Sequence, residues 1–210
     1  MLLIVMNKDI KNHYKKLFHK YGDSHHSAQY SSKNSQVARL KILCEIGELR
    51  NTKILDFGCG TATLAAYLDN LNLNVKYTGT DIVEEFLQTS RVKFPKYRFG
   101  YYDEFRKEKF DFILIGGVFN NKIDNNFEFF KETISMLFKN TKVGLSCNLM
   151  NHHVDYFNND LWYVKPEDVY SFLRTLSPYI TIRNDYIVKN TNVPFDFSFY
   201  IYKNPIKAYK

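Results

Sequence analysis

Cysteine is scarce in this sequence, and none of it is paired. The 210 residues include only Cys44, Cys59 and Cys147, which lie far apart and form no Cys-x-x-Cys spacing. Disulfide scaffolds and structural zinc sites depend on such pairs, so the spacing argues against both classes of protein. We expect a protein of a reducing cytoplasm that holds no metal.

Long apolar runs are missing as well. The opening MLLIVM is six residues long and is followed at once by the charged segment NKDIKNHYKK. A membrane-spanning helix needs about 20 apolar residues and a secretory signal needs roughly 7–15. The sequence therefore predicts neither a membrane span nor export.

The positive charge has no dense run. The formal net charge is +7, but lysine and arginine are scattered along the chain, as is usual for a solvated surface. There is no internal repeat, low-complexity segment or linker. Length and a hydrophobic content of 45% favour one domain over residues 1–210, with N-terminal helices and a lid in 1–50 and the core in 51–210.

Two helices are expected before the core. Apolar side chains recur with helical spacing from Ile10 to Phe18, and Gly22 offers a stop. The polar stretch GDSHHSAQYSSKNSQ reads as a loop, and a second helix is expected from about Ser35.

From residue 53 onward, short apolar runs alternate with helical patterns. The expected strands are KILDF, KYTGTDI, YRFGYY, FDFILIGG and KVGLSCNLM, separated by segments such as VEEFLQTSRVK and NFEFFKETISMLFK. Helical crossovers are what parallel strands need, so the pattern predicts a doubly wound α/β sheet. After a helix in KPEDVYSFLRTL, the runs ITIRNDYIV and DFSFYIYK predict two closing strands that pair antiparallel.

The stretch ILDFGCGTATL places a turn at the carboxyl end of the first strand, where open α/β sheets bind ligands. Gly58 and Gly60 allow a sharp turn and a close approach to a ligand. Asp81 ends the second strand 25 positions after Asp56. An acid there either accepts the hydroxyls of a ribose or caps the following helix, and both interpretations stay open.

Ribose recognition suits a nicotinamide cofactor or S-adenosylmethionine. The nicotinamide fingerprint G-x-G-x-x-G has Thr63 at its third glycine. Asp56 would repel a pyrophosphate, whereas it suits a ligand with an ammonium and a sulfonium group. A dehydrogenase is therefore the weaker hypothesis.

These motifs resemble a known family. LDFGCGTATL, YTGTDI and FDFILIGGVFN are similar in order and spacing to the first, second and fourth motifs of class I S-adenosylmethionine-dependent methyltransferases. The resemblance covers about residues 36–203. It implies a Rossmann-like, seven-stranded mixed sheet with the last strand antiparallel, and S-adenosyl-L-methionine as cofactor with S-adenosyl-L-homocysteine as product.

The resemblance also implies roles for single residues. The methionine part would contact the first motif, Asp81 would hold the ribose, Ile82 and Tyr102 would lie beside the adenine, and Asp103 would accept from its amino group. Val118, Phe119 and Asn120 would separate cofactor from acceptor. The implied cofactor-binding set is Arg39, Asp56, Gly58, Cys59, Gly60, Thr61, Asp81, Ile82, Tyr102, Asp103, Gly117 and Val118.

Two points in this set are specific to the chain. Ala62 replaces the third glycine of the usual G-x-G-x-G. The segment before the core resembles that of small bacterial methyltransferases, which would give Arg39 the methionine carboxylate as partner, a role that suits a forked guanidinium. The alternative for Arg39 is a surface arginine near a helix start.

A hydroxyl acceptor would benefit from a base, for which histidine is the first candidate. His152 and His153 follow the fifth strand, with Asp155 close behind, and His25 lies in the expected lid. We take these four as catalytic candidates, although histidines are more often surface or hydrogen-bonding residues.

The acceptor is predicted to be a small molecule, and the resemblance to small bacterial methyltransferases implies that the methyl group goes to a hydroxyl of a saccharide or metabolite precursor. GGVFNN has no proline, whereas DNA amino methylation usually shows D/N-P-P-Y/F after the fourth strand, and no residues remain for an RNA-recognition domain. The alternatives are an RNA-modifying enzyme and a module that binds the cofactor without turnover.

Overall fold

Seven strands lie side by side in one sheet, in the order β3-β2-β1-β4-β5-β7-β6. The computed structural model describes residues 8–188 and 192–206. The strands are β1 (Lys53–Phe57), β2 (Lys76–Thr80), β3 (Arg98–Gly100), β4 (Phe110–Ile115), β5 (Thr141–Met150), β6 (Ile180–Arg183) and β7 (Asp196–Tyr202). The predicted doubly wound sheet is confirmed.

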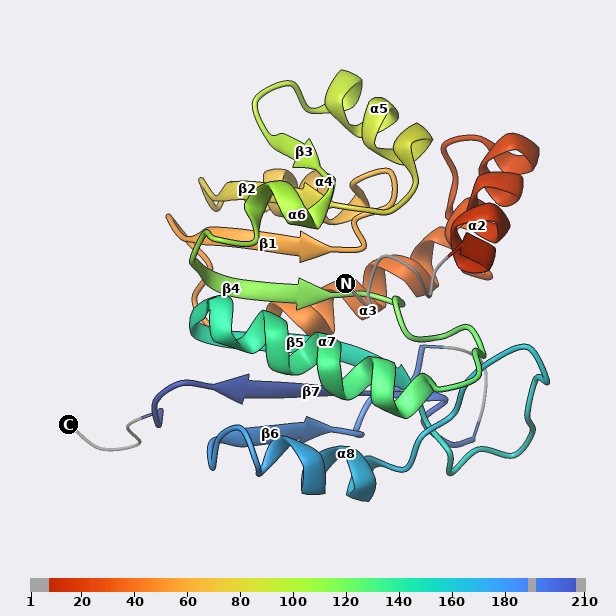
Figure 1. Cartoon of the computed structure of the whole chain (residues 1–210), viewed down its shortest axis with the longest axis vertical. Helices are drawn as coiled ribbons and strands as arrows, with labels where there is room; N and C mark the ends of the chain where they lie inside the picture. The colour runs from red at the N-terminus through yellow and green to blue at the C-terminus, as the bar shows by residue number, and fades with distance from the viewer. Residues whose placement is uncertain (1–7, 189–191, 207–210) are drawn as a thin grey trace.

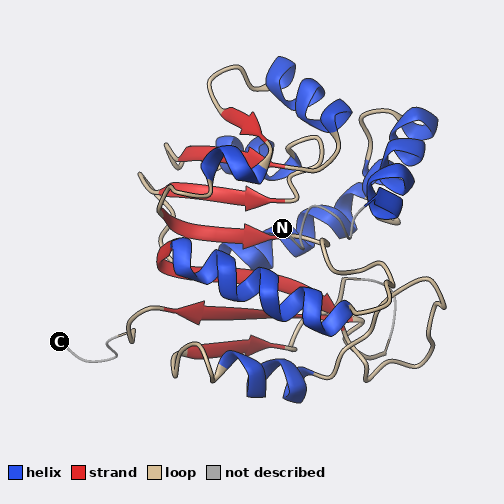
Figure 2. Ribbon diagram, viewed as in Figure 1, coloured by secondary structure: helices blue, strands red, loops and turns tan. Residues whose placement is uncertain are grey.

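Helices cover both faces of this sheet, with α7 and α8 on one face and α3 and α4 on the other (Figures 1 and 2). The helical segments are α2 (Lys8–Tyr21), a 3-10 turn (His25–Ala28), α3 (Lys33–Cys44), α4 (Thr63–Asn70), α5 (Glu84–Lys93), α6 (Tyr102–Phe105), α7 (Asn126–Asn140) and α8 (Pro166–Leu173). In the described residues, no helix is long and apolar enough to cross a membrane.

The sheet divides the core into two clusters because side chains alternate along each strand. Ile54 belongs to the cluster under α3 and α4, whereas its neighbour Leu55 belongs to the cluster under α7 and α8. Both are fully buried. Strands covered on both faces read as continuous apolar runs, which explains KILDF and FDFILI.

The closing strands pair as predicted. β7 runs antiparallel to both β5 and β6, while β1 is parallel to β2 and β4. Because β1 lies between β2 and β4, the carboxyl ends of these three strands meet at one edge of the sheet, the edge beside α2 (Figure 1).

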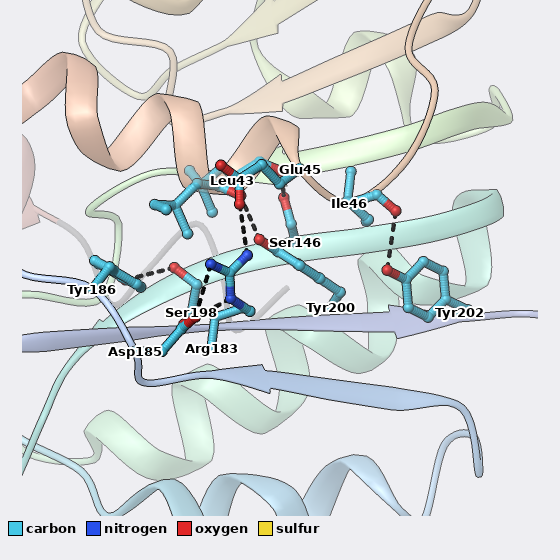
Figure 3. A network of polar contacts seen from close by, with 11 residues as sticks. Leu43, Glu45, Ile46, Ser146, Arg183, Asp185, Tyr186, Ser198, Tyr200 and Tyr202 are labelled. Carbon is cyan, nitrogen blue, oxygen red and sulfur yellow. Dashed lines mark hydrogen bonds and ion pairs between the residues drawn. The ribbon is translucent and has the colours of Figure 1, made fainter. Parts of the chain in front are cut away.

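Hydroxyl groups from the sheet anchor the C-terminal end of α3 (Figure 3). The last carbonyls of a helix have no partner within it. Here Ser146 Oγ donates to Leu43 O at 3.0 Å, Tyr200 Oη to Ile42 O at 2.5 Å and Tyr202 Oη to Ile46 O at 3.0 Å. Two of these bonds hold the last turn of α3, and the third holds the segment just after it that leads into β1.

We expect Ser146→Ala to lower the free energy of unfolding by about 1–3 kcal/mol, because it leaves the buried carbonyl of Leu43 without its donor. Urea unfolding measures the change. Ser171→Ala is the matched control, since the Ser171 hydroxyl makes a similar 2.8 Å bond to Glu167 O at the exposed surface of α8. Equal losses in the two variants would contradict the assigned role of Ser146.

Candidate functional site

A cavity of about 1190 Å³ opens at the carboxyl ends of β1, β2 and β4. It reaches from the turn after β1, past the end of β2, to α6 and to the segment between β4 and α7. α2 contributes Lys8, Ile10, Lys11 and Tyr14 to its lining. The predicted ligand edge of the sheet is therefore hollow, with the N-terminal helix as one of its walls.

Glycine at position 58 is required by the turn that forms the floor of this cavity. Gly58 has φ of 81°, and a Cβ there would meet Val118 Cγ2 at 2.3 Å. The amide groups of Gly58 and Cys59 both donate to Thr80 O, at 2.8 and 2.9 Å. These bonds hold the turn against the end of β2, and the side of the turn that faces the cavity can contact a ligand.

Ala62 has a positive φ although it is not a glycine. Its φ is 62°, in the left-handed region that favours glycine, and its side chain is fully buried at the start of α4. The methyl group costs about 1–2 kcal/mol in this conformation. The chain thus adopts at Ala62 a conformation that the third glycine of G-x-G-x-G would take without strain.

Asp56, the residue before the last of β1, is 5% exposed and lines the cavity. Burial raises the pKa of its carboxyl group to about 7, although Tyr77 Oη donates a 2.5 Å hydrogen bond that favours the ionised form. The carboxylate of Asp81 adds to the shift. A cationic ligand group would stabilise the charge that burial disfavours.

Asp81 makes two backbone contacts and still has capacity to accept more. Its carboxylate accepts from Gly60 N at 2.8 Å and from Val83 N at 3.0 Å. Burial raises the pKa of the group to about 6 despite these bonds. Because each carboxylate oxygen has two acceptor sites, Asp81 can support the turn and the start of α5 and also receive two hydroxyl groups. The two interpretations of Asp81 are compatible.

Eleven of the twelve predicted cofactor residues line the one cavity. They are Asp56, Gly58, Cys59, Gly60, Thr61, Asp81, Ile82, Tyr102, Asp103, Gly117 and Val118. Their chemistry fits S-adenosylmethionine: an acid beside a glycine turn would suit the methionine ammonium, Asp81 would suit the ribose, and Ile82 and Tyr102 would offer apolar surface to the adenine. Asp103, exposed at the start of α6, suits the adenine amino group.

Arg39 is the exception, because the structure gives it other partners. Its Nε and Nη2 donate to the two oxygens of Asp196 at 2.5 and 2.9 Å, and its Nη1 donates to Ser35 O at 3.0 Å and to Ser35 Oγ. Arg39 is 5% exposed and is absent from the cavity lining. It is neither the surface arginine nor the cavity residue that the sequence suggested, but half of a buried ion pair.

All four catalytic candidates are described in the structure, and none of them lines the cavity. His153 Nε2 is 3.0 Å from Glu167 Oε1 at the surface, and His152 and Asp155 are exposed. The ring of His25 lies against that of His26, with centroids 4.0 Å apart and an interplanar angle of 40°. No group of three or more metal-ligating side chains occurs among the described residues. A catalytic role for these four stays a prediction that this geometry does not favour.

Two tyrosines from the N-terminal segment were missed by the sequence interpretation. Tyr14 and Tyr30 line the cavity, and burial raises the pKa of both phenols, that of Tyr30 to about 12. Asn121 Nδ2 donates to Tyr14 Oη at 2.8 Å, which joins α2 to the segment after β4. Tyr14 follows the apolar spacing of its helix, so the sequence alone assigns it to the core.

α2 is fixed over the cavity by contacts with the start of α5. Phe18 and Phe86 pack edge to face with centroids 5.3 Å apart, and Lys15 Nζ lies 2.6 Å from Glu85 Oε1. Because Asp81 and Ile82 immediately precede α5, these contacts hold Tyr14 near the predicted ribose site.

Known proteins share this fold. Residues 55–143 match the family model described as a methyltransferase domain. No curated protein matches the sequence. Among solved structures, magnesium protoporphyrin IX methyltransferase from Synechocystis PCC 6803 with bound S-adenosylmethionine has a TM-score of 0.64 at 14% identity, covering 97% of this chain and 95% of that one.

Two further solved structures share the fold, and this chain covers nearly all of the first and about half of the second. A methyltransferase from Archaeoglobus fulgidus, dependent on S-adenosylmethionine, has a TM-score of 0.63 at 16% identity and covers 83% of this chain and 96% of its own. Phosphoethanolamine N-methyltransferase 1 from Haemonchus contortus has a TM-score of 0.68 at 12% identity and covers 100% of this chain and 51% of its own.

Proposed function

We propose that this chain is a class I S-adenosylmethionine-dependent methyltransferase that transfers the methyl group to a hydroxyl of a small molecule such as a saccharide or metabolite precursor; the match of residues 55–143 to a methyltransferase domain supports this. The observation that carries the proposal is the size and cover of the cavity. At about 1190 Å³ it exceeds the roughly 300–1,000 Å³ of a site for one drug-sized ligand, so an acceptor fits beside the cofactor.

The cover of the cavity favours a small acceptor. α2 and Tyr30 line the cavity, and Tyr14 on α2 accepts a hydrogen bond from Asn121 in the segment after β4. A folded protein or an RNA duplex would need an open surface there, whereas a small molecule fits between the two tyrosines and the segment after β4. The solved relatives differ in acceptor, with a porphyrin and phosphoethanolamine in their names.

Methyl transfer requires the protein mainly to align the acceptor oxygen with the methyl group. When bound, S-adenosylmethionine would supply an electrophilic methyl group to the acceptor oxygen, and S-adenosylhomocysteine and the hydroxyl proton would be released. Asp56, Gly58 and Asp81 would orient the donor, and the buried walls exclude solvent from the reacting atoms.

Titration calorimetry with S-adenosylhomocysteine tests the cofactor site. We expect Asp81→Ala to weaken binding by about 1–3 kcal/mol, the scale of a lost charged hydrogen bond. Asp69→Ala is the control, because the Asp69 carboxylate pairs with Lys96 Nζ at 2.8 Å on the outer surface. Unchanged affinity in Asp81→Ala would contradict the assignment of Asp81.

Transfer of a radiolabelled methyl group tests the acceptor class. The substrates are monosaccharides, their phosphate and nucleotide esters, and total RNA, each with the wild-type protein and S-adenosylmethionine. We expect label in a hydroxyl of a small molecule. Label only in RNA would replace the proposal by the RNA-modifying alternative, and binding without any transfer would support a cofactor-binding module.

A further inference from the structure

The cavity extends along the whole length of α7, away from the glycine turn. Its lining includes residues from both ends of this 15-residue helix: Asn126 and Phe129 near the start, and Met136, Lys139 and Asn140 near the end. At 1.5 Å per residue these positions span about 20 Å. The cavity is therefore elongated, and the part of it beside α7 is called the α7 groove below.

The α7 groove is open because α6 is too short to cover the sheet beside it. Both helices lie on the same face of the sheet, where Phe105 of α6 and Phe129 of α7 belong to one core cluster. α6 has four residues, about one turn, whereas α7 has 15. Phe57 at the end of β1 and Tyr102 on α6 stay half-buried and pack edge to face, with centroids 5.5 Å apart. Together with Met136 of α7, these two side chains give the groove apolar walls.

The far end of the α7 groove is basic. Arg106 and Lys107, which follow α6, and Lys139 in the last turn of α7 all line the cavity. Asn140 Nδ2 donates to Tyr102 Oη at 2.9 Å and to Arg106 O at 2.7 Å, so the two helix ends lie side by side. The three basic residues are thus gathered at one end of the groove.

These three basic residues form no ion pair within the part of the chain that the structure describes. The acids near them have other partners. Glu104 accepts the backbone N–H of the residue before α6 at 2.7 Å, and Glu108 lies 2.5 Å from Lys53 Nζ and 2.9 Å from Arg98 Nη2. Asp103, at the start of α6, is the predicted partner of the adenine amino group. Cations that line a cleft without acidic partners attract an anionic ligand.

The near end of the α7 groove lies beside the cover of the cavity. Asn126, the first residue of α7, donates its Nδ2 to Asn121 O at 2.8 Å, and Asn121 Nδ2 donates to Tyr14 Oη of α2 at 2.8 Å. All three residues line the cavity. A molecule held under α2 can therefore continue along α7 towards the basic end.

We propose that the α7 groove binds an apolar chain that ends in a carboxylate or a phosphate, as the part of the acceptor remote from its methylated hydroxyl. The apolar walls remove the chain from water, and the basic end pairs with the anionic group. A neutral, polar molecule would do neither. That this ligand is the acceptor rests on the proposed function, whereas its binding can be measured without methyl transfer.

Decanoate, decyl phosphate and decanol serve as probes, because they share one chain and differ in the end group. Calorimetric titrations below the micellar concentration use protein saturated with S-adenosylhomocysteine, which fills the cofactor site. We expect both anions to bind at one molecule per chain and roughly threefold or more tighter than decanol, and inorganic phosphate alone not to bind. The tighter anion identifies the end group.

Two variants separate the charge from the chain. Arg106→Gln/Lys139→Gln should weaken binding of both anions roughly two- to thirtyfold, the scale of two exposed charge pairs, and leave decanol unchanged. Met136→Gln makes a wall of the groove polar and should weaken decanol and decanoate alike. Lys131→Gln is the matched control: Lys131 is on α7 but outside the cavity lining, and its Nζ lies 2.6 Å from Glu128 Oε1.

Equal anion affinities in the wild type and the double variant, or decanol binding as tightly as both anions, would overturn the assignment. Release of the anions by S-adenosylhomocysteine would also overturn it, because it would place the chain in the cofactor site. If the anions bind as expected but the transfer screen is negative, the proposed function fails and the groove stands. If a small molecule is methylated but neither anion binds, the groove fails and the proposed function stands.

Discussion

Arg39→Met is expected to lower the free energy of unfolding by about 3–5 kcal/mol, the usual cost of breaking a buried ion pair by removing one partner. Asp196 is fully buried in β7 and accepts two bonds from the guanidinium, at 2.5 and 2.9 Å. Without Arg39 its carboxylate stays in the same low-dielectric surroundings and loses the charge that balances it. Urea unfolding at constant pH measures the loss.

The double variant Arg39→Met/Asp196→Asn separates charge from packing. Because it removes both charges, we expect it to regain at least half of the stability that Arg39→Met loses. If Arg39 instead held the methionine carboxylate, Arg39→Met would fold with nearly unchanged stability and bind S-adenosylhomocysteine poorly. That pattern would contradict the ion-pair role and restore the prediction made from the sequence.

The fold and the glycine turn could be predicted because their signals are local. The seven strands are short apolar runs, and the turn at Gly58 and Gly60 follows directly from its strand. Asp81 comes one residue after β2, so its place at the ligand edge follows from the topology alone. These residues need no knowledge of contacts between distant parts of the chain.

The role of Arg39 could not be predicted because its partner is 157 residues away. An arginine in the middle of α3 looks the same in sequence whether it faces a ligand or Asp196. The acceptor side was missed for a related reason, since Tyr14 and Tyr30 come from the N-terminal segment and reach the cavity only through the packing of α2 on α5. His152 and His153 were predicted for the opposite reason. They follow β5 at the edge of the sheet where the ligand is expected, yet their side chains do not line the cavity.

Asp56→Asn is expected to stabilise the cofactor-free protein at pH 8. The Asp56 pKa is about 7 in the folded protein and about 3.9 in an unfolded chain. Between about pH 4 and pH 7, the Asp56 carboxyl group is ionised in the unfolded chain but still protonated in the folded protein. The free energy of unfolding therefore falls as the pH rises through this range. The shift of about three units corresponds to at most about 4 kcal/mol. Asparagine carries no charge, and it can still accept the bond from Tyr77 Oη.

The stability difference between Asp56→Asn and the wild type should therefore widen between pH 5 and pH 8. Denaturant unfolding at the two pH values measures it, and comparison with the wild type cancels the contributions of other groups. Asp160→Asn, an exposed acid after β5, is the matched control and should show no widening. A constant difference for Asp56→Asn would contradict the raised pKa.

The same substitution should have the opposite effect on cofactor binding. In the proposed contact, the Asp56 carboxylate pairs with the methionine ammonium, so binding requires Asp56 to lose its proton. Wild-type affinity for S-adenosylmethionine should rise about five- to tenfold from pH 6 to 7.5, as the group ionises while the ammonium, with a pKa near 8, stays mostly charged. In Asp56→Asn the rise should fall to about twofold, the part due to Asp81, and affinity at pH 7.5 should be lower. If this contact forms, an acid that destabilises the cofactor-free protein is compensated by the ammonium group of the bound cofactor, which would account for Asp56 near the end of β1. Equal pH profiles for the two proteins would place the ammonium elsewhere.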